Sequence, residues 1–221
     1  MLKFTRIVFA AVLMVFTMIS TSVGHCEKAP QYGADKAILA YAEVYAFGAS
    51  SHSKYIGLSK SDINKIERQI TAKFADDFKE FCLSEESLNK LTNVYVKKFK
   101  SDMKIKTAFK EKNETSPVVS LTANILNNES YKNQARNDKN LKDMLSSISR
   151  LKNEGKTDSD LLADSVFQKK SVDCITNFIK GLSINQQKTI YVKCKEIKGE
   201  DEKMYWAPGD PDVVMNFVQG K

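Results

Sequence analysis

The spacing of apolar residues changes from a helical to a strand period at Met103, and this change constrains the fold more than any other sequence feature. Before it, isoleucine and phenylalanine recur at intervals of three and four from Ile63 to Phe81, which is typical of an amphipathic helix. After it, apolar residues alternate with lysine and polar residues at Ile105–Phe109 and again at Val119–Ile125, which predicts a β-hairpin. Helices followed by an antiparallel hairpin predict an α+β fold.

The same order of elements returns in the second half of the chain. Helical spacing covers residues 141–155 and 158–182, and strand spacing follows at 190–195 and 203–206. A short last helix is expected between Asp210 and Gly220, because aspartate caps a helix, proline fits its first position and glycine ends it. The polar, asparagine-rich segment 127–140 is interpreted as the boundary between the halves.

This repetition predicts two tandem units, residues 25–130 and residues 131–221, each with helices packed on a small antiparallel sheet. Helical spacing from Gly33 to Phe47, with a stop at Gly48, and again after Ser84 provides the other helices of the first unit. Two strands make a thin sheet for one domain, so a single sheet shared by both units is the alternative.

Residues 1–24 have the features of a signal peptide. Lys3 and Arg6 precede an uncharged apolar run from Ile7 to Ile19, and Ser22 and Gly24 supply the small residues before a cleavage site. Thirteen apolar residues in a helix are too short for a hydrocarbon core of about 30 Å. We therefore expect cleavage near Gly24 and an extracytoplasmic protein that is secreted, periplasmic or on the cell surface.

Four cysteines would enter an oxidising environment after export: Cys26, Cys82, Cys174 and Cys194. The sequence does not choose among their three complete pairings, and Cys194 is interpreted as a buried apolar residue in preference to a disulfide partner. Cys26 follows the apolar run and is a candidate for lipidation, although the bulky His25 stands where lipoproteins carry a small residue. Membrane association is expected only if Cys26 is lipidated.

The formal charge of +7 becomes +5 once the two basic residues of the signal peptide are removed. Only four of the 34 basic residues are arginine, whereas recognition of bases and phosphates favours the bidentate guanidinium group. The lysine excess therefore predicts a solvated surface and no nucleic-acid partner, with attraction to anionic envelope polymers as its functional consequence.

No catalytic motif stands out in the sequence. Two histidines offer little to metal or triad chemistry, and the chain lacks a G-x-S-x-G, an H-E-x-x-H and a glycine-rich phosphate loop. The acidic clusters around Asp76, Asp158 and Asp201 are interpreted as helix caps and solvated surface. We therefore expect no enzymatic activity, no metal and no cofactor.

Two sets of residues are candidates for weak ligand binding. Tyr205 and the only tryptophan, Trp206, should point to opposite sides of a strand, so that one packs in the core and the other can form the wall of a ligand site. Lysines repeat on the predicted strand faces at Lys104, Lys106, Lys110, Lys193 and Lys195. These lysines either protect the sheet from edge pairing or bind an anionic polymer.

Three motifs carry a resemblance: Tyr41-Ala42-Glu43-Val44-Tyr45 up to Gly48, Ile56-Gly57-Leu58-Ser59, and Trp206-Ala207-Pro208 before Asp210. With them the mature chain resembles a family of exported proteins and lipoproteins of Gram-positive-type bacteria whose function is unknown. The resemblance implies tandem domains similar to cystatin or nuclear-transport-factor folds. Its members usually carry a lipid-attachment cysteine, and the family brings no catalytic residues.

The sequence thus predicts a non-enzymatic cell-envelope protein that binds or organises a small ligand, a peptide or an anionic polymer. The alternative is an envelope hydrolase with paired carboxylates in a sheet cavity, which would place two acids of perturbed pKa together in a pocket. Neither the ligand nor the oligomeric state can be read from the sequence.

Overall fold

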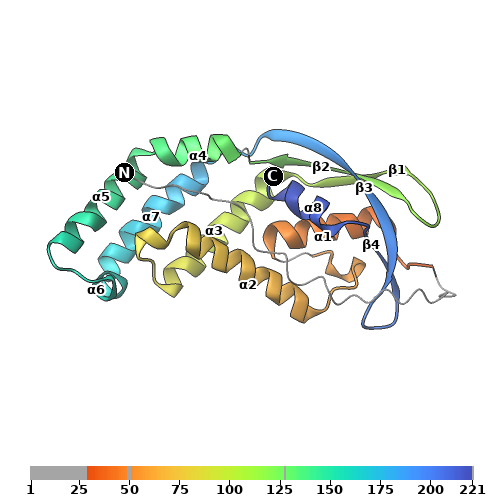
Figure 1. Cartoon of the computed structure of the whole chain (residues 1–221), viewed down its shortest axis with the longest axis horizontal. Helices are drawn as coiled ribbons and strands as arrows, with labels where there is room; N and C mark the ends of the chain where they lie inside the picture. The colour runs from red at the N-terminus through yellow and green to blue at the C-terminus, as the bar shows by residue number, and fades with distance from the viewer. Residues whose placement is uncertain (1–28, 49–50, 127, 221) are drawn as a thin grey trace. The chain divides into compact units, whose positions relative to one another are not determined.

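The computed structural model describes residues 29–48, 51–126 and 128–220. Within these residues eight α-helices accompany a four-stranded antiparallel sheet, which confirms the α+β prediction (Figure 1). The predicted signal peptide and Cys26 lie outside the described residues. No helix in the described part of the chain is long and apolar enough to span a membrane.

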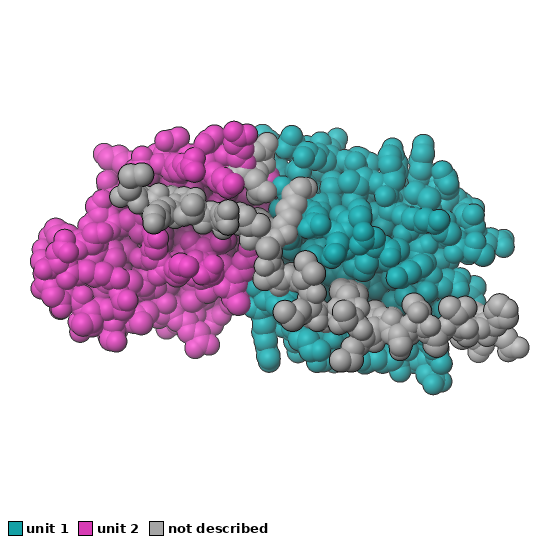
Figure 2. Space-filling view, viewed as in Figure 1, with its two compact units in different colours: residues 1–70, 103–125, 185–221 teal, residues 71–102, 126–184 magenta. Residues whose placement is uncertain are grey.

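The chain divides into two compact units (Figure 2). Unit 1 is formed by the described parts of residues 1–70, 103–125 and 185–221, and unit 2 by those of residues 71–102 and 126–184. The units do not follow the predicted division at residue 130, since unit 1 takes the strands of both predicted halves and unit 2 takes mostly helices.

The sheet of unit 1 has the strand order β1-β2-β3-β4. Its strands are β1 (Lys106–Glu111), β2 (Val118–Ile125), β3 (Gln186–Lys198) and β4 (Met204–Pro208). The two predicted hairpins are present. Strand β2 pairs with β3 and joins the hairpins into one sheet, which is the shared-sheet alternative of the sequence analysis. This pairing satisfies backbone groups that two separate two-stranded sheets would leave exposed.

One face of this sheet is covered by two helices, α1 (Ala34–Phe47) and α8 (Pro211–Val218) (Figure 1). The strict alternation of buried and half-buried residues along β2 shows which face is covered. Val119, Leu121, Ala123 and Ile125 are at most 2% exposed and form the core with the apolar side of α1. The opposite side chains of β2 are half-buried and polar apart from Val118.

The predicted helix ends of unit 1 are found in the structure. Gly48 ends α1 in the left-handed conformation, with φ 72°, and its N–H donates to the carbonyl of Val44. Asp210 caps α8 by accepting from the N–H of Asp212, and Pro211 takes the first helical position. The short 3₁₀ helix η1 (Ser53–Tyr55) lies between α1 and α2 (Lys60–Asp77), and residues 60–70 of α2 belong to unit 1.

All regular elements in the described part of unit 2 are helices. It contains the end of α2, the 3₁₀ helix η2 (Lys79–Phe81), α3 (Glu85–Met103) up to residue 102, α4 (Asn128–Asn137), α5 (Lys139–Asn153), α6 (Asp158–Ala163) and α7 (Ser165–Gly181). Its core is aromatic: the Phe74 ring lies 4.8 Å from Phe78 and 5.6 Å from Tyr95, and Tyr131 packs edge-on against Phe178 at 5.8 Å.

Three helix predictions need correction in this unit. The segment 127–140, interpreted as the boundary between the halves, contains the helix α4, because Tyr131 and the buried Ala135 lie one helical turn apart and pack inward. The predicted helix at 158–182 is interrupted at Asp164, whose carboxylate caps α7 by accepting from two backbone N–H groups. The long isoleucine-phenylalanine helix ends at Asp77, and its last phenylalanine belongs to η2.

Candidate functional site

The uncovered face of the sheet in unit 1 gathers four lysines, Lys106, Lys110, Lys193 and Lys195, which we call the lysine face. Lys106 on β1 lies across from Thr122 of β2, and Lys193 on β3 lies across from Val118 of β2. Lys195 follows Lys193 on the same side of β3, because side chains alternate along a strand. The Lys110 ammonium lies 5.9 Å from the ring of Tyr191, which is 60% exposed.

The lysine face carries excess positive charge. Among the described residues, none of its four lysines forms an ion pair with a carboxylate, and the register places one acid, Glu111, on this side, across from Val118. Hydroxyl groups lie between the lysines, and those of Thr122 and Thr189 are 2.8 Å apart. Such a surface can attract a polyanion electrostatically and offer it hydrogen bonds.

The structure separates the residues that the sequence grouped as ligand-binding candidates. Lys106, Lys193 and Lys195 lie together on the lysine face, whereas Lys104 precedes β1 in a left-handed conformation with φ 47° and is not part of a strand face. Trp206 is 8% exposed and packs in the core, while Tyr205 is half-buried. The expected division of the two aromatic residues between core and surface is therefore confirmed.

A second surface feature of unit 1 is the tyrosine cluster, which we define as Tyr32, His52, Tyr55 and Tyr205. The Tyr205 ring joins the cluster through Gly57, two residues after Tyr55, on which it packs. The Tyr32 and Tyr55 rings meet edge to face at 4.8 Å, and the His52 ring stacks on Tyr55 at 5.8 Å. The Tyr205 hydroxyl donates to Asp201 Oδ2 at 3.0 Å. Burial, followed by this hydrogen bond, raises the pKa of Tyr205.

Sequence reasoning did not find Tyr32, His52 and Tyr55. They lie in the segments before and after α1, between 150 and 173 residues from Tyr205 along the chain. No spacing rule links residues so far apart, because only the tertiary fold brings them together. The one related residue in the sequence analysis is Gly57, which belongs to a motif of the family resemblance. In the structure it lies so close to the Tyr205 ring that an added Cβ would be 3.1 Å from Tyr205 Cδ2.

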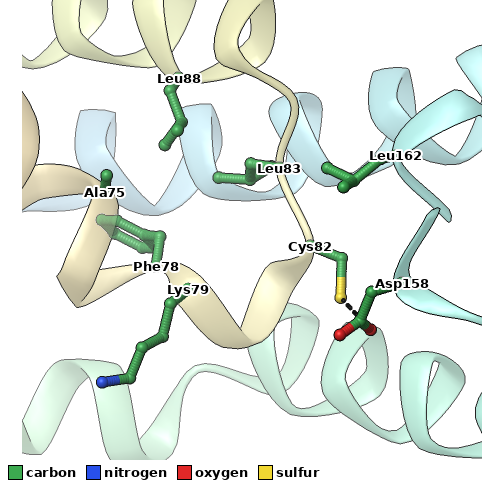
Figure 3. A pocket seen from close by; sticks show the side chains of 8 residues that line it. All are labelled: Ala75, Phe78, Lys79, Cys82, Leu83, Leu88, Asp158 and Leu162. Atoms are coloured by element: carbon green, nitrogen blue, oxygen red, sulfur yellow. Dashed lines mark hydrogen bonds between the residues drawn. The ribbon is translucent and has the colours of Figure 1, made fainter.

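Unit 2 contains a pocket of about 300 Å³ (Figure 3). Its lining residues are Ala75, Phe78, Lys79, Cys82, Leu83, Leu88, Asp158 and Leu162. Most of the wall is apolar, and the one carboxylate belongs to Asp158 at the start of α6. The volume is at the lower end of the range for small-molecule sites, about 300–1,000 Å³.

Two polar side chains of this pocket, Cys82 and Asp158, form a hydrogen-bonded group with Lys152, which is not among the lining residues. The Cys82 thiol donates to Asp158 Oδ1 at 3.3 Å (Figure 3), and Lys152 Nζ approaches the same oxygen at 2.6 Å. Burial and the hydrogen bond to Asp158 raise the pKa of Cys82. The hydrogen bonds from Lys152 and Cys82 lower the pKa of Asp158. The pocket thus holds a protonated thiol beside an ion pair. A protonated thiol is a poor nucleophile.

The other thiols are also protonated at neutral pH. Cys82, Cys174 and Cys194 are free, and burial raises the pKa of Cys174 to about 11 and of Cys194 to about 12. Cys194 is 1% exposed on the covered face of the sheet, as a buried apolar residue would be. Among the described residues, no cluster of histidine, cysteine and acidic side chains could hold a metal ion.

Comparison with known proteins finds a similar fold but no family to which the chain can be assigned. No protein-family model matches the chain, and no curated protein matches it significantly. Among solved structures, the chain is similar to a Bacillus subtilis protein described as "a putative lipoprotein (ycdA)", with a TM-score of 0.51 and 18% sequence identity. The match covers 84% of this chain and 55% of the other, so the chain spans about half the length of that protein. At this identity the likeness concerns the fold alone.

Proposed function

We propose that the protein is a non-enzymatic, extracytoplasmic binding protein whose lysine face holds an anionic polymer of the cell envelope. The observation that carries this proposal is the gathering of Lys106, Lys110, Lys193 and Lys195 on the uncovered sheet face, where none of them pairs with a carboxylate of the described residues. Protection against edge pairing explains the lysines on the edge strand β1 and Lys195, where β3 pairs only with β4. It does not explain Lys193, which lies across from Val118 on β2 and whose carbonyl accepts from the Gly209 N–H on its other side.

Export is supported by the signal-peptide features of residues 1–24. The fold likeness to a protein described as a lipoprotein agrees with a place outside the cytoplasm. Lipidation of Cys26 would anchor the protein to a membrane, whereas cleavage near Gly24 without lipid would release a soluble protein. Intact mass measurement of the protein from its own host distinguishes the two outcomes.

The hydrolase alternative finds no support in the described pocket. Hydrolysis by paired carboxylates needs two acids that face each other across a cleft. The pocket of unit 2 is lined by the single carboxylate of Asp158, whose pKa is lowered, while the acid with a raised pKa, Asp77, is not among the lining residues. Binding on the lysine face therefore remains the better supported proposal.

The test measures the affinity of the mature protein for linear polyphosphate at several salt concentrations. Lysine contacts with a polyanion release counterions. Replacing the four lysines by glutamine should therefore weaken binding at low salt and reduce the slope of log K against log salt concentration by about three. The matched control replaces four exposed lysines of unit 2 by glutamine: Lys139, Lys142, Lys169 and Lys170. Equal effects of the two variants would mean that only net charge matters, and salt-independent binding would contradict the proposal.

A further inference from the structure

We propose that the tyrosine cluster of unit 1, with Lys36 and Lys54 beside it, is a binding site for a pyranose ring that carries a carboxylate. This site is separate from the lysine face: it shares none of its residues, and it recognises a sugar ring rather than charge alone. The proposal therefore goes beyond polyanion binding and can stand or fail independently of it.

Three segments of unit 1 deliver the four rings. Tyr32 precedes α1, His52 and Tyr55 lie at η1, and Tyr205 lies on β4. Tyr55 is at the centre, with Tyr32 at 4.8 Å and His52 at 5.8 Å between ring centroids. All four side chains are half-buried. Aromatic residues drawn from distant segments to a surface, yet left partly exposed, provide flat apolar faces with polar rims.

The Tyr205 ring is held in place before any ligand arrives. A Cβ added to Gly199 would lie 2.7 Å from Tyr205 Cε2, and one added to Gly57 would lie 3.1 Å from Cδ2, so the ring packs directly on two glycines. Its hydroxyl is fixed by the bond to Asp201, which in turn pairs with Lys203 at 2.8 Å. A preorganised ring loses little conformational entropy when a ligand stacks on it.

The charge at the cluster favours an anionic ligand. The ammonium groups of Lys36 and Lys54 lie 5.7 Å and 5.2 Å from the centroid of the Tyr55 ring. Among the described residues neither lysine pairs with a carboxylate, whereas His52 is engaged by Glu43 at 2.8 Å. Two unpaired ammonium groups therefore lie beside an aromatic face, where a carboxylate on a stacked ring can reach them.

An acidic sugar matches both parts of this arrangement. The C–H groups of a pyranose form an apolar face that packs on aromatic rings, and its hydroxyls can bond the phenol and carboxylate groups at the rim. A carboxylate on the ring pairs with Lys36 or Lys54. A simple inorganic polyanion would use the lysines and leave the rings without a role, and a neutral sugar would use the rings and leave the lysines without one.

The experiment titrates the mature protein with three probes: trigalacturonate, the neutral maltotriose, and linear polyphosphate. Trigalacturonate should bind most tightly to the wild type at the tyrosine cluster. Tyr55→Leu should weaken it at least tenfold, and Lys36→Gln with Lys54→Gln should reduce its preference over maltotriose. Tyr191→Leu makes the same change at a 60% exposed tyrosine outside the cluster, and this matched control should bind trigalacturonate as the wild type does. Thermal unfolding of each variant checks that it is folded.

Three results would overturn the proposal: no trigalacturonate binding at millimolar concentration, equal binding of maltotriose, or trigalacturonate binding that Tyr55→Leu leaves intact. The lysine-face variant separates this proposal from the proposed function. It should lose polyphosphate binding while retaining trigalacturonate binding, so failure at one site is distinguishable from failure at the other. Trigalacturonate binding lost in the lysine-face variant but kept in Tyr55→Leu would also count against the tyrosine cluster.

Discussion

The side-chain amide of Gln168 fixes the backbone of Cys82: its Nε2 donates to the Cys82 carbonyl oxygen at 2.8 Å. Cys82 has a left-handed backbone with φ 49°, which is uncommon for a residue other than glycine. The same amide donates to the carbonyl of Leu161, and its Oε1 accepts from the Ser84 N–H and the Ser87 hydroxyl, both at 2.8 Å. One buried glutamine thus connects the polar backbone around the pocket of unit 2.

Replacing Gln168 by methionine should destabilise unit 2 strongly. Methionine has a similar length but satisfies none of the four hydrogen bonds, and each buried group left without a partner costs about 1–3 kcal/mol. We expect a loss of about 3–5 kcal/mol in the free energy of unfolding, measured by urea titration. Gln187→Met, the same change at an exposed position of β3, should cost less than about 0.5 kcal/mol. Equal losses would contradict the role of the buried amide.

Local chemistry allowed much of the fold to be predicted from the sequence. The end of α1 at Gly48 and the start of α8 at Asp210 depend on residues within one turn of the helix end. The hairpin of β1 and β2 depends on alternation over a few residues. In each case the residues that determine the element are neighbours in the chain.

Long-range pairing could not be predicted in the same way. The register between Val118 and Lys193 joins strands that are 75 residues apart in sequence, and it decides that the hairpins share a sheet. The tyrosine cluster depends on the same kind of contact between distant segments. Helix α4 was missed because only two of its side chains, Tyr131 and Ala135, indicate a buried face within an otherwise polar segment.

Gly48 should tolerate alanine poorly for two separate reasons. Its φ of 72° disfavours any side chain, and an added Cβ would lie 2.8 Å from the backbone α-carbon of Glu67. Gly155 has φ 92° but open space around it, so Gly155→Ala measures the conformational cost alone, about 1–2 kcal/mol. Gly48→Ala should cost about 1–2 kcal/mol more in unfolding free energy, because the backbone must also move. Equal costs would show that the contact with Glu67 relaxes freely.

Asp77 should make unit 2 less stable at neutral than at acidic pH. Burial, assisted by the charge of Asp76, raises its pKa from 3.8 to about 6, against the opposing effect of Lys73. The folded chain therefore binds this proton more tightly than the unfolded chain does. Its contribution to stability is fully present below pH 3.8 and is lost as the pH rises through about 6. The difference corresponds to about 2–3 kcal/mol.

Asp77→Asn should remove most of this pH dependence. The amide stays neutral, so the variant should be more stable than the wild type at pH 7.5 and similar to it at pH 4, in urea titrations at both values. Asp173→Asn is the control, because that carboxylate is exposed on α7 of the same unit and is not among the groups that shift the pKa of Asp77. The same change in stability at both pH values would show that packing, and not ionisation, distinguishes the asparagine.

The thiol of Cys82 should respond in opposite directions to the loss of its two charged neighbours. Asp158 accepts its hydrogen bond and favours the protonated thiol, while the Lys152 ammonium favours the thiolate. Because only the thiolate is alkylated, Asp158→Asn should speed the reaction with iodoacetamide at pH 8, and Lys152→Met should slow it. Peptide mass spectrometry measures the modification of each cysteine separately.

Cys174 in the same samples is the internal control, since its raised pKa depends on burial and on Asp138 and Asp143. A change in the same direction in both variants would mean that they open the pocket to the reagent, and that the hydrogen bond to Asp158 does not control the thiol.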